Sequence, residues 1–297
     1  MRILLTGSSG QVGGALRRPL SRIGSVIAPG RGELDLAQPD GVAAALDRLA
    51  PDLIINPAAY TAVDRAEDEP ELAMRVNAES PRRLAAWAAA RGVALMHFST
   101  DYVFDGTGER PWREDDAPAP LSVYGASKLA GETAVRVASG AHLIIRASWV
   151  YAASGTNFLR AIARLARERR ELRIVADQIG APTSARAIAE AVATIVGENV
   201  EALPEAFARS RGVVHLACTG ATSWHGFATA IVEGLRVRGM PLEAATIVPI
   251  RTAEYPTRAH RPSNSRLDQS RLHEVFGVML PHWTDALAVE LDEFVRF

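Results

Sequence analysis

The first thirteen residues place an apolar run, residues 2–6, directly before glycines at positions 7, 10 and 13. A short apolar run that ends in a glycine-rich turn is typical of a buried parallel strand leading into a helix. The free N–H groups of such a turn, together with the positive end of the helix dipole, form a site for a pyrophosphate. The spacing is GxxGxxG rather than the GxGxxG of common dehydrogenases. An ordinary glycine turn is the alternative interpretation.

Strand and helix patterns alternate through the first half of the chain, which predicts an α/β fold with a doubly wound parallel sheet of the Rossmann type. The predicted strands cover residues 2–6, 25–28, 52–56, 93–98 and 142–147, and the predicted helices cover 41–49, 71–91 and 124–138. The first helix should start near residue 15, and Pro19 should limit it to one or two turns or kink it.

Beyond residue 150 the pattern is less regular, and residues 172–176 and 213–217 are interpreted as later edge strands of the sheet. We expect a dinucleotide-binding domain and a smaller C-terminal substrate domain, with the active site in the cleft between them. The first comprises residues 1–149 with 172–200 and 212–218, and the second comprises 150–171 and 219–297. The irregular segment 250–267 carries four arginines, which suit a diphosphate.

Composition excludes several classes of protein. The 297 residues carry a net charge of -1 and are 48% hydrophobic, which favours a packed core and gives no support to nucleic-acid binding. No apolar stretch reaches the ~20 residues of a membrane helix. The chain enters its first strand at residue 2, which leaves no room for a signal segment. We expect a cytoplasmic protein.

Tyr124 and Lys128 lie four residues apart in a predicted helix, so both side chains share one face. A phenol titrates near pH ~10, and a cation beside it favours the phenolate and lowers that pKa toward the working range. Thr100 follows the buried strand 93–98 at the edge where open α/β sheets place ligands. Its hydroxyl there suits a substrate carbonyl oxygen, although a simple serine-threonine turn is the alternative.

These signals, in this order, resemble the extended short-chain dehydrogenase/reductase superfamily. Further blocks resemble one of its families, the dTDP-4-dehydrorhamnose reductases. They are residues 56–64 (NPAAYTAVD), 99–104 (STDYVF), 146–151 (RASWVY), 177–183 (DQIGAPT) and 261–265 (RPSNS). The resemblance covers nearly the whole chain.

The resemblance implies reduction of the C4 ketone of dTDP-4-dehydro-6-deoxy-L-mannose to dTDP-L-rhamnose, with NADPH as the coenzyme and NADH also accepted. Thr100 would orient the carbonyl, Tyr124 would donate the proton, and Lys128 would hold the nicotinamide ribose and tune Tyr124. The implied coenzyme-binding residues are Gly7, Gly10, Gln11, Val12, Gly13, Arg31, Asp35, Leu36, Ala58, Ala59, Tyr60, Asn77, Tyr124 and Lys128. The implied substrate-binding residues are Val63, Thr100, Asp101, Phe104, Trp149, Asn157 and Arg261.

Three of these assignments also rest on the residues themselves. The second strand runs into a segment without a carboxylate before Glu33, so Arg31 can pair with a 2′-phosphate. Pro81 deprives the Asn77 carbonyl of its helical partner, unless Ser80 and Pro81 cap a new helix. Trp149 follows a strand at the cleft, where it covers the deoxysugar or packs between the domains.

Rival functions remain. A nucleotide-sugar 4,6-dehydratase would carry glutamate where this chain has Tyr102. A 4-epimerase or another 4-ketoreductase would differ in how it handles coenzyme and sugar. A non-catalytic NADP-binding regulatory subunit would not need Thr100, Tyr124 and Lys128 together. We expect no metal and a monomer or homodimer.

Overall fold

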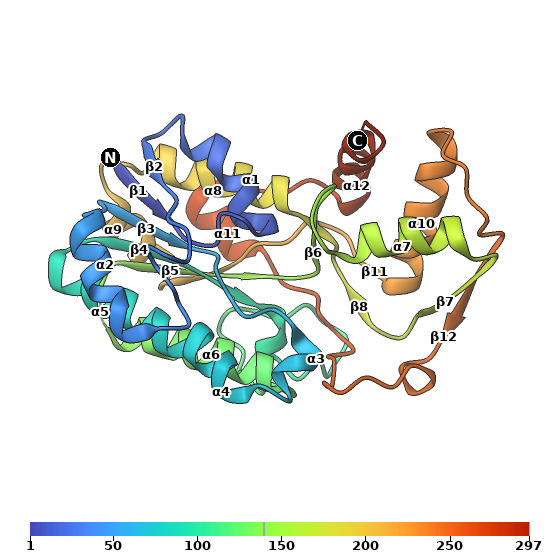
Figure 1. The fold of residues 1–297 in the computed structure, drawn as a ribbon, viewed down its shortest axis with the longest axis horizontal. Coiled ribbons are helices and arrows are strands. Elements are labelled where there is room, and N and C mark those ends of the chain that lie inside the picture. Colours follow the sequence, from blue (N-terminus) through green and yellow to red (C-terminus); the bar gives the residue numbers. More distant parts are fainter. Residues whose placement is uncertain (139, 297) are drawn as a thin grey trace.

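A computed structural model describes residues 1–138 and 140–296. Its centre is a six-stranded sheet in the order β10-β5-β4-β3-β1-β2, with every neighbouring pair parallel (Figure 1). The strands are β1 (Arg2–Leu5), β2 (Ser25–Ile27), β3 (Leu53–Asn56), β4 (Ala94–Thr100), β5 (His142–Ala147) and β10 (Val213–His215). The doubly wound parallel sheet is confirmed, and the five strands predicted in the first half lie within two residues of their predicted bounds.

Helices cover both faces of this sheet because its strands are apolar on both sides. Along β1, Ile3 and Leu5 point into one hydrophobic cluster and Leu4 points into another, as the two-residue period of a strand requires. Two groups of helices lie on opposite faces (Figure 1). One group is α1 (Gln11–Leu20) and α8 (Ala185–Glu198), and the other is α2 (Val42–Leu49), α5 (Ser80–Arg91) and α6 (Val123–Val137).

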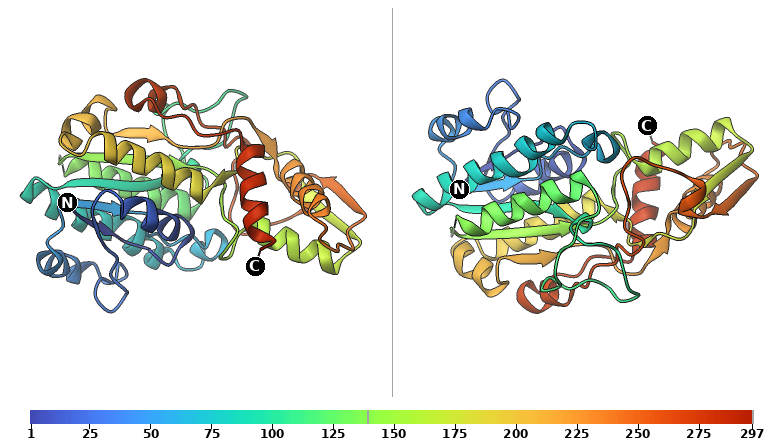
Figure 2. Two further views of the ribbon diagram at one scale, coloured as in Figure 1. Left: turned by 90° about the horizontal axis from the view of Figure 1, so that it is seen from above. Right: turned by 90° about the horizontal axis from the view of Figure 1, so that it is seen from below.

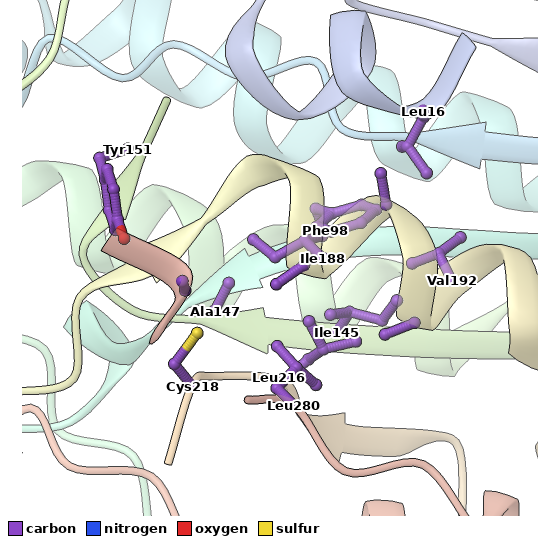
Figure 3. Close-up of a cluster of buried hydrophobic side chains, with 14 of the residues drawn as sticks. Leu16, Phe98, Ile145, Ala147, Tyr151, Ile188, Val192, Leu216, Cys218 and Leu280 are labelled. Atoms are coloured by element: carbon purple, nitrogen blue, oxygen red, sulfur yellow. The ribbon is translucent and has the colours of Figure 1, made fainter. Parts of the chain in front are cut away.

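The larger cluster lies between β4, β5 and helices α1 and α8. Figure 3 shows Phe98 and Ile145 of the sheet facing Ile188 and Val192 of α8. The same cluster continues through Tyr151 into the smaller part of the molecule. A continuous core therefore joins the two parts.

The smaller unit contains three short strand pairs and the helices around them (Figure 2). Its strands are β6 (Val150–Tyr151), β7 (Glu171–Val175), β8 (Ile179–Gly180), β9 (Thr183–Ser184), β11 (Thr222–Ser223) and β12 (Thr246–Ile250). Its helices are α7 (Phe158–Glu168), α10 (Trp224–Val237) and α12 (Trp283–Phe294). The remaining helices are α3 (Val63–Ala66), α4 (Pro70–Met74), α9 (Leu203–Arg209) and α11 (Ser270–Phe276). No helix within residues 1–138 and 140–296 is long and apolar enough to cross a membrane.

One of the two predicted edge strands is wrong. β10 lies beside β5 at the edge of the main sheet, as expected. β7 instead pairs with β12 in the smaller unit, so residues 172–176 do not return to the sheet, whereas α8 lies on it. A five-residue strand carries no sequence signal for its partner, and β12 pairs with β7 along its whole length, with each paired residue seventy-five positions later in the chain.

The first helix is longer than predicted, because α1 continues through Pro19 to Leu20. A proline in the last turn removes a single helical hydrogen bond. Leu16 and Leu20, one turn apart, are both completely buried. Their burial, worth about 1.5–3 kcal/mol each, outweighs that loss.

The predicted helix 71–91 is interrupted by a π-helical turn, Arg75–Glu79, between α4 and α5. Asn77 lies in this turn, four residues before Pro81, where the backbone hydrogen bond was expected to fail. Ser80 does not cap α5, because its hydroxyl donates to the Leu36 carbonyl at 2.7 Å. A Cβ on Gly131 of α6 would lie 2.1 Å from the Asn77 carbonyl oxygen, so α6 packs directly on the turn.

Candidate active site

A cavity of about 1100 Å³ runs along the C-terminal ends of β1, β3 and β4 and extends to the smaller unit. This is the edge where open α/β sheets hold ligands. It brings together most of the residues predicted from the sequence. Those that line it are Gly7, Gly10, Gln11, Val12, Gly13, Arg31, Asp35, Leu36, Ala58, Ala59, Tyr60, Val63, Thr100, Asp101, Tyr124, Lys128, Trp149 and Asn157.

The glycine turn needs its glycines for space. Gly7 has a φ of 58°, and a Cβ there would lie 2.8 Å from the Ala58 Cα. A Cβ on Gly13 would lie 2.1 Å from the Gly7 carbonyl oxygen. Gly10 precedes α1 and has no side chain to cap it, so the first N–H groups of the helix face the cavity as donors for a phosphate.

Thr100, Tyr124 and Lys128 meet at the middle of the cavity. Thr100 is the last residue of β4, and its hydroxyl accepts from the Tyr102 N–H at 3.2 Å and donates to Asp101 Oδ1 at 3.0 Å. Tyr124 lies in the first turn of α6, which Ser122 caps by accepting from the Gly125 N–H at 3.2 Å. A Cβ on Gly125 would lie 2.2 Å from the Tyr102 carbonyl oxygen, so this glycine lets the helix start against the end of β4.

The electrostatics differ from expectation. Burial raises the pKa of Tyr124 to about 12, although a hydrogen bond with Thr100 acts in the opposite direction. Burial also lowers the pKa of Lys128 to about 8, with nearby Glu132 acting to raise it. Lys128 was expected to lower the pKa of Tyr124. Its ammonium instead donates to the Phe98 carbonyl at 2.6 Å and lies 3.5 Å from His97 Nε2.

Asp101 and Tyr102 extend this polar group. Burial raises the pKa of Asp101 to about 6, and hydrogen bonds from Ser265 and Thr100 act against that rise. The Tyr102 ring meets the Tyr124 ring edge-on, with centroids 5.6 Å apart. Burial raises the pKa of the Tyr102 phenol above its usual value. The residue that follows Asp101 is therefore a neutral phenol and not a carboxylate base.

Asn77 does not line the cavity but fixes its wall. Its side-chain oxygen accepts from the Tyr60 N–H at 2.8 Å, and its side-chain nitrogen donates to the Tyr60 carbonyl at 3.0 Å and to Ser127 Oγ at 3.0 Å. The loop that follows β3 and helix α6 are therefore joined at Tyr60 and Ser127 through one buried side chain. Asn77 acts on the cavity through Tyr60 and Ser127.

Trp149 lies on the cavity wall and packs against the smaller unit. It lines the cavity, and its ring stacks on Trp224 of α10 with centroids 3.6 Å apart and planes at 10°. Its φ is 47°, and a Cβ on Gly180 would lie 2.5 Å from its ring. The indole therefore packs between Trp224 and Gly180 of the smaller unit and also lines the cavity.

Two other predicted substrate residues lie away from the cavity. Phe104 is fully buried and stacks on Trp112 with ring centroids 4.6 Å apart. Its side chain belongs to a separate hydrophobic cluster, so its prediction as a substrate-contact residue is not supported. Arg261 pairs with Asp64 of α3 at 2.7 Å. This guanidinium and its hydrogen bonds hold the pKa of Asp64 below its usual range. Arg258 forms an ion pair with Asp68. The two ion pairs connect segment 250–267 to the unit that contains the main sheet.

Comparison with known proteins agrees with this geometry. Residues 1–296 match the sequence family described as RmlD substrate binding domain. A dTDP-4-dehydrorhamnose reductase of Burkholderia thailandensis is 47% identical over 295 residues, 97% of each chain. One from Clostridium acetobutylicum superposes with a TM-score of 0.90 at 33% identity over the whole of both chains. One from Bacillus anthracis, solved in complex with NADP, has a TM-score of 0.87 at 32% identity and covers 98% of this chain and 99% of that one.

The chain belongs to the dTDP-4-dehydrorhamnose reductase family. The family predicted from the motifs is confirmed, and with it the class of oxidoreductase.

Sequence reasoning missed several residues that this reductase fold brings to the cavity. Trp224, Thr156 and Phe158 all line it from the smaller unit. Trp224 follows a capped helix start at Ser223, which is a signal for a helix but not for a site. Asn157 was predicted, but its side chain also caps α7 by accepting from the Arg160 N–H at 3.2 Å.

Proposed function

We propose that this protein reduces the C4 ketone of dTDP-4-dehydro-6-deoxy-L-mannose to dTDP-L-rhamnose with NADPH. The observation that carries the proposal is the meeting of Thr100, Tyr124 and Lys128 in one cavity with the glycine turn. A pyrophosphate site and a paired hydroxyl and phenol beside one another are what a carbonyl reductase needs.

The residues present fit the coenzyme. The cradle formed by Gly7 and Gly13 leaves no room for a Cβ, which allows a phosphate to approach the backbone closely. Arg31 lies on the cavity wall near Asp35 and Leu36 and suits a 2′-phosphate through its planar pair of donors. When bound, NADPH supplies the hydride that adds to C4 of the sugar.

The protein's own side chains supply the proton. Tyr124 donates its phenolic hydrogen to the C4 oxygen as the hydride adds to the carbon, and it regains a proton from solvent after product leaves. Thr100 turns its hydroxyl from Asp101 to the same oxygen and stabilises the developing negative charge. Lys128, whose ammonium is fixed at the Phe98 carbonyl, is proposed to hold the nicotinamide ribose in the cavity.

The substrate half of the cavity is proposed to hold the sugar and diphosphate. Val63 and Asp101 face it from the sheet unit, and Trp149 and Asn157 face it from the other side. Arg261 uses part of its guanidinium on Asp64, and a guanidinium has five N–H donors. Arg261 is not on the cavity wall, so its remaining donors suit a diphosphate that extends beyond the cavity toward segment 250–267.

The experiment is NADPH oxidation by the purified protein with the keto-sugar nucleotide. A reductase releases one NADP⁺ for each sugar reduced. A 4-epimerase would keep its coenzyme and show no net oxidation, and a regulatory subunit would bind NADPH without turnover. Substrate reduced at the same rate with Tyr124→Phe would contradict the site. UDP- and GDP-linked keto-sugars used in parallel define the nucleotide.

We further propose a monomer or homodimer that works in the cytoplasm, where NADPH is regenerated, and a substrate domain built mainly from residues 150–171 and 219–297. Light scattering coupled to size exclusion measures the assembly. Cell fractionation with an antibody tests the location.

A further inference from the structure

A chain of polar contacts crosses the sheet beneath the active site. His97 on β4 is completely buried, with Nε2 3.5 Å from Lys128 Nζ and Nδ1 3.0 Å from the carboxamide nitrogen of Asn56 on β3. The Asn56 carboxamide oxygen lies 2.5 Å from the hydroxyl of Thr6. Thr6 precedes Gly7 and accepts from the Ala58 N–H at 3.3 Å.

These three polar side chains are buried among the apolar residues of β1, β3 and β4. Asn56 and His97 are direct partners in the register of β3 and β4, and Thr6 follows β1. Burying polar groups costs free energy unless each is hydrogen bonded, and apolar residues would form the same strands. The chain connects the backbone of the coenzyme turn to the ammonium of Lys128, which is a connection that packing alone does not require.

We propose that His97 is a positioning residue for Lys128: its neutral imidazole accepts an N–H of the ammonium and, through Asn56 and Thr6, holds the lysine in place relative to the coenzyme turn. The inference rests on the proposed function in one respect, that Lys128 serves the reaction. The Phe98 carbonyl is the second acceptor, at 2.6 Å. Two fixed acceptors define where the ammonium lies better than one.

The hydrogen arrangement follows from the charge of Lys128. Every hydrogen of an ammonium is a donor, so Nε2 of His97 has to be an acceptor and Nδ1 has to carry the hydrogen. Nδ1 then donates to the Asn56 carboxamide, which presents its oxygen there and turns its nitrogen to Thr6. The two ends of a carboxamide occupy equivalent places, and a hydroxyl accepts as readily as it donates. In the structure the Thr6 hydroxyl donates to the Asn56 oxygen at 2.5 Å, so this arrangement reverses the carboxamide and lengthens the contact with Thr6 by a few tenths of an ångström.

Burial and the charge of Lys128 keep His97 neutral. Burial lowers its pKa well below the usual value, and Lys128 of α6 acts in the same direction. Glu132, the next acidic group along α6, faces Lys128 and is itself paired with Arg146 of β5 at 2.7 Å. From β1 and β3, the groups that face the chain are the neutral side chains of Thr6 and Asn56.

The first experiment compares His97→Leu with His97→Gln, using the pH profile of kcat/KM for NADPH, which reports the free enzyme. Loss of the His97 acceptor destabilises the charged form of Lys128 and lowers its pKa. We therefore expect the alkaline limb of His97→Leu to move down by about one pH unit, a change of about tenfold in the protonation equilibrium. The glutamine oxygen replaces the acceptor, so His97→Gln should keep the limb close to that of the wild type.

His215 supplies the matched control. It is also a completely buried histidine of the same sheet, on β10, and its ring meets Phe104 and the Asp268 carbonyl rather than the site. His215→Leu should lower the melting temperature and leave the alkaline limb in place. An unmoved limb in His97→Leu, or equal shifts in the leucine and glutamine variants, overturns the proposal.

A second experiment needs neither substrate nor a core variant. Nitrogen-15 NMR of the imidazole rings in the wild-type protein reports protonation and tautomer, and the chain has seven histidines. His97 should stay neutral with its hydrogen on Nδ1 across about pH 5 to 8, and its signal should change as Lys128 loses its proton. A hydrogen on Nε2, or a charged ring at neutral pH, overturns the assignment. An inactive wild-type protein with the expected tautomer would overturn the proposed function alone.

Discussion

The two halves of the cavity are built differently. The coenzyme half consists of short segments that each follow a strand of the main sheet, such as Gly7 to Gly13 after β1 and Ala58 to Tyr60 after β3. The substrate half depends on contacts between distant segments, including the stack of Trp149 on Trp224 and the pairing of Arg261 with Asp64. Local motifs define the first half, whereas tertiary packing assembles the second.

Tyr124→Phe should produce the largest effect, because it removes the proton donor where the two halves meet. We expect kcat to fall by ~10²–10⁴ with little change in melting temperature. Steady-state kinetics and a thermal melt measure both quantities. A variant that keeps half the wild-type rate would assign the acid to another group.

Lys128→Met should lower kcat/KM by ~10², the lower end of what a positioned acid-base group contributes, and should raise the KM for coenzyme. Its effect on stability depends on pH. The folded pKa of about 8 lies below the usual 10.5, so the unfolded chain binds more protons between these values and wild-type stability gains with rising pH.

The methionine variant lacks that gain. Its melting temperature relative to the wild type should therefore fall as pH rises from about 8 to 10.5. Parallel melts of the two proteins across this range check the sign. A difference that stays constant with pH would mean that Lys128 is not a buried cation in the folded protein.

Arg31→Ala tests whether the coenzyme half is defined by its local segment. A charge-assisted hydrogen bond of ~1.5–3 kcal/mol corresponds to a ten- to hundredfold preference for NADPH. The variant should lose most of this preference and keep its kcat at saturating NADH. Wild-type protein that already uses both coenzymes equally well would remove Arg31 from the site.

Trp149→Ala and Trp224→Ala test the distant contact in the substrate half. Each should raise the substrate KM about two- to tenfold, because losing an aromatic stack costs ~0.5–1.5 kcal/mol, and should change the NADPH KM far less. The double variant should cost less than the sum of the two, since either change breaks the same stack. Equal effects on both KM values would indicate loss of packing between the units.

The same contrast explains which predictions failed. Pro81 indicated an irregular turn at Asn77, four residues earlier in the same predicted helix, and the structure has a π-helical turn there. Thr100, Tyr124 and Lys128 were predicted from their local spacing. β7 was assigned to the wrong sheet, and Phe104 was placed at the substrate although it stacks on Trp112. Both errors concern which distant or folded-back segment a residue meets: β7 pairs with β12, and Phe104 stacks on Trp112 after the chain turns.

The sequence by itself determined the parallel sheet, the glycine turn and the candidate catalytic group, because each depends on residues within a few positions of one another and on strand ends that share one edge. Only the tertiary structure decided that Trp224 stacks on Trp149 and that Asp64 pairs with Arg261. It also decided that the Lys128 ammonium lies against the Phe98 carbonyl and His97. These contacts form because packing of distant segments brings the side chains together. A short stretch of sequence does not contain that information.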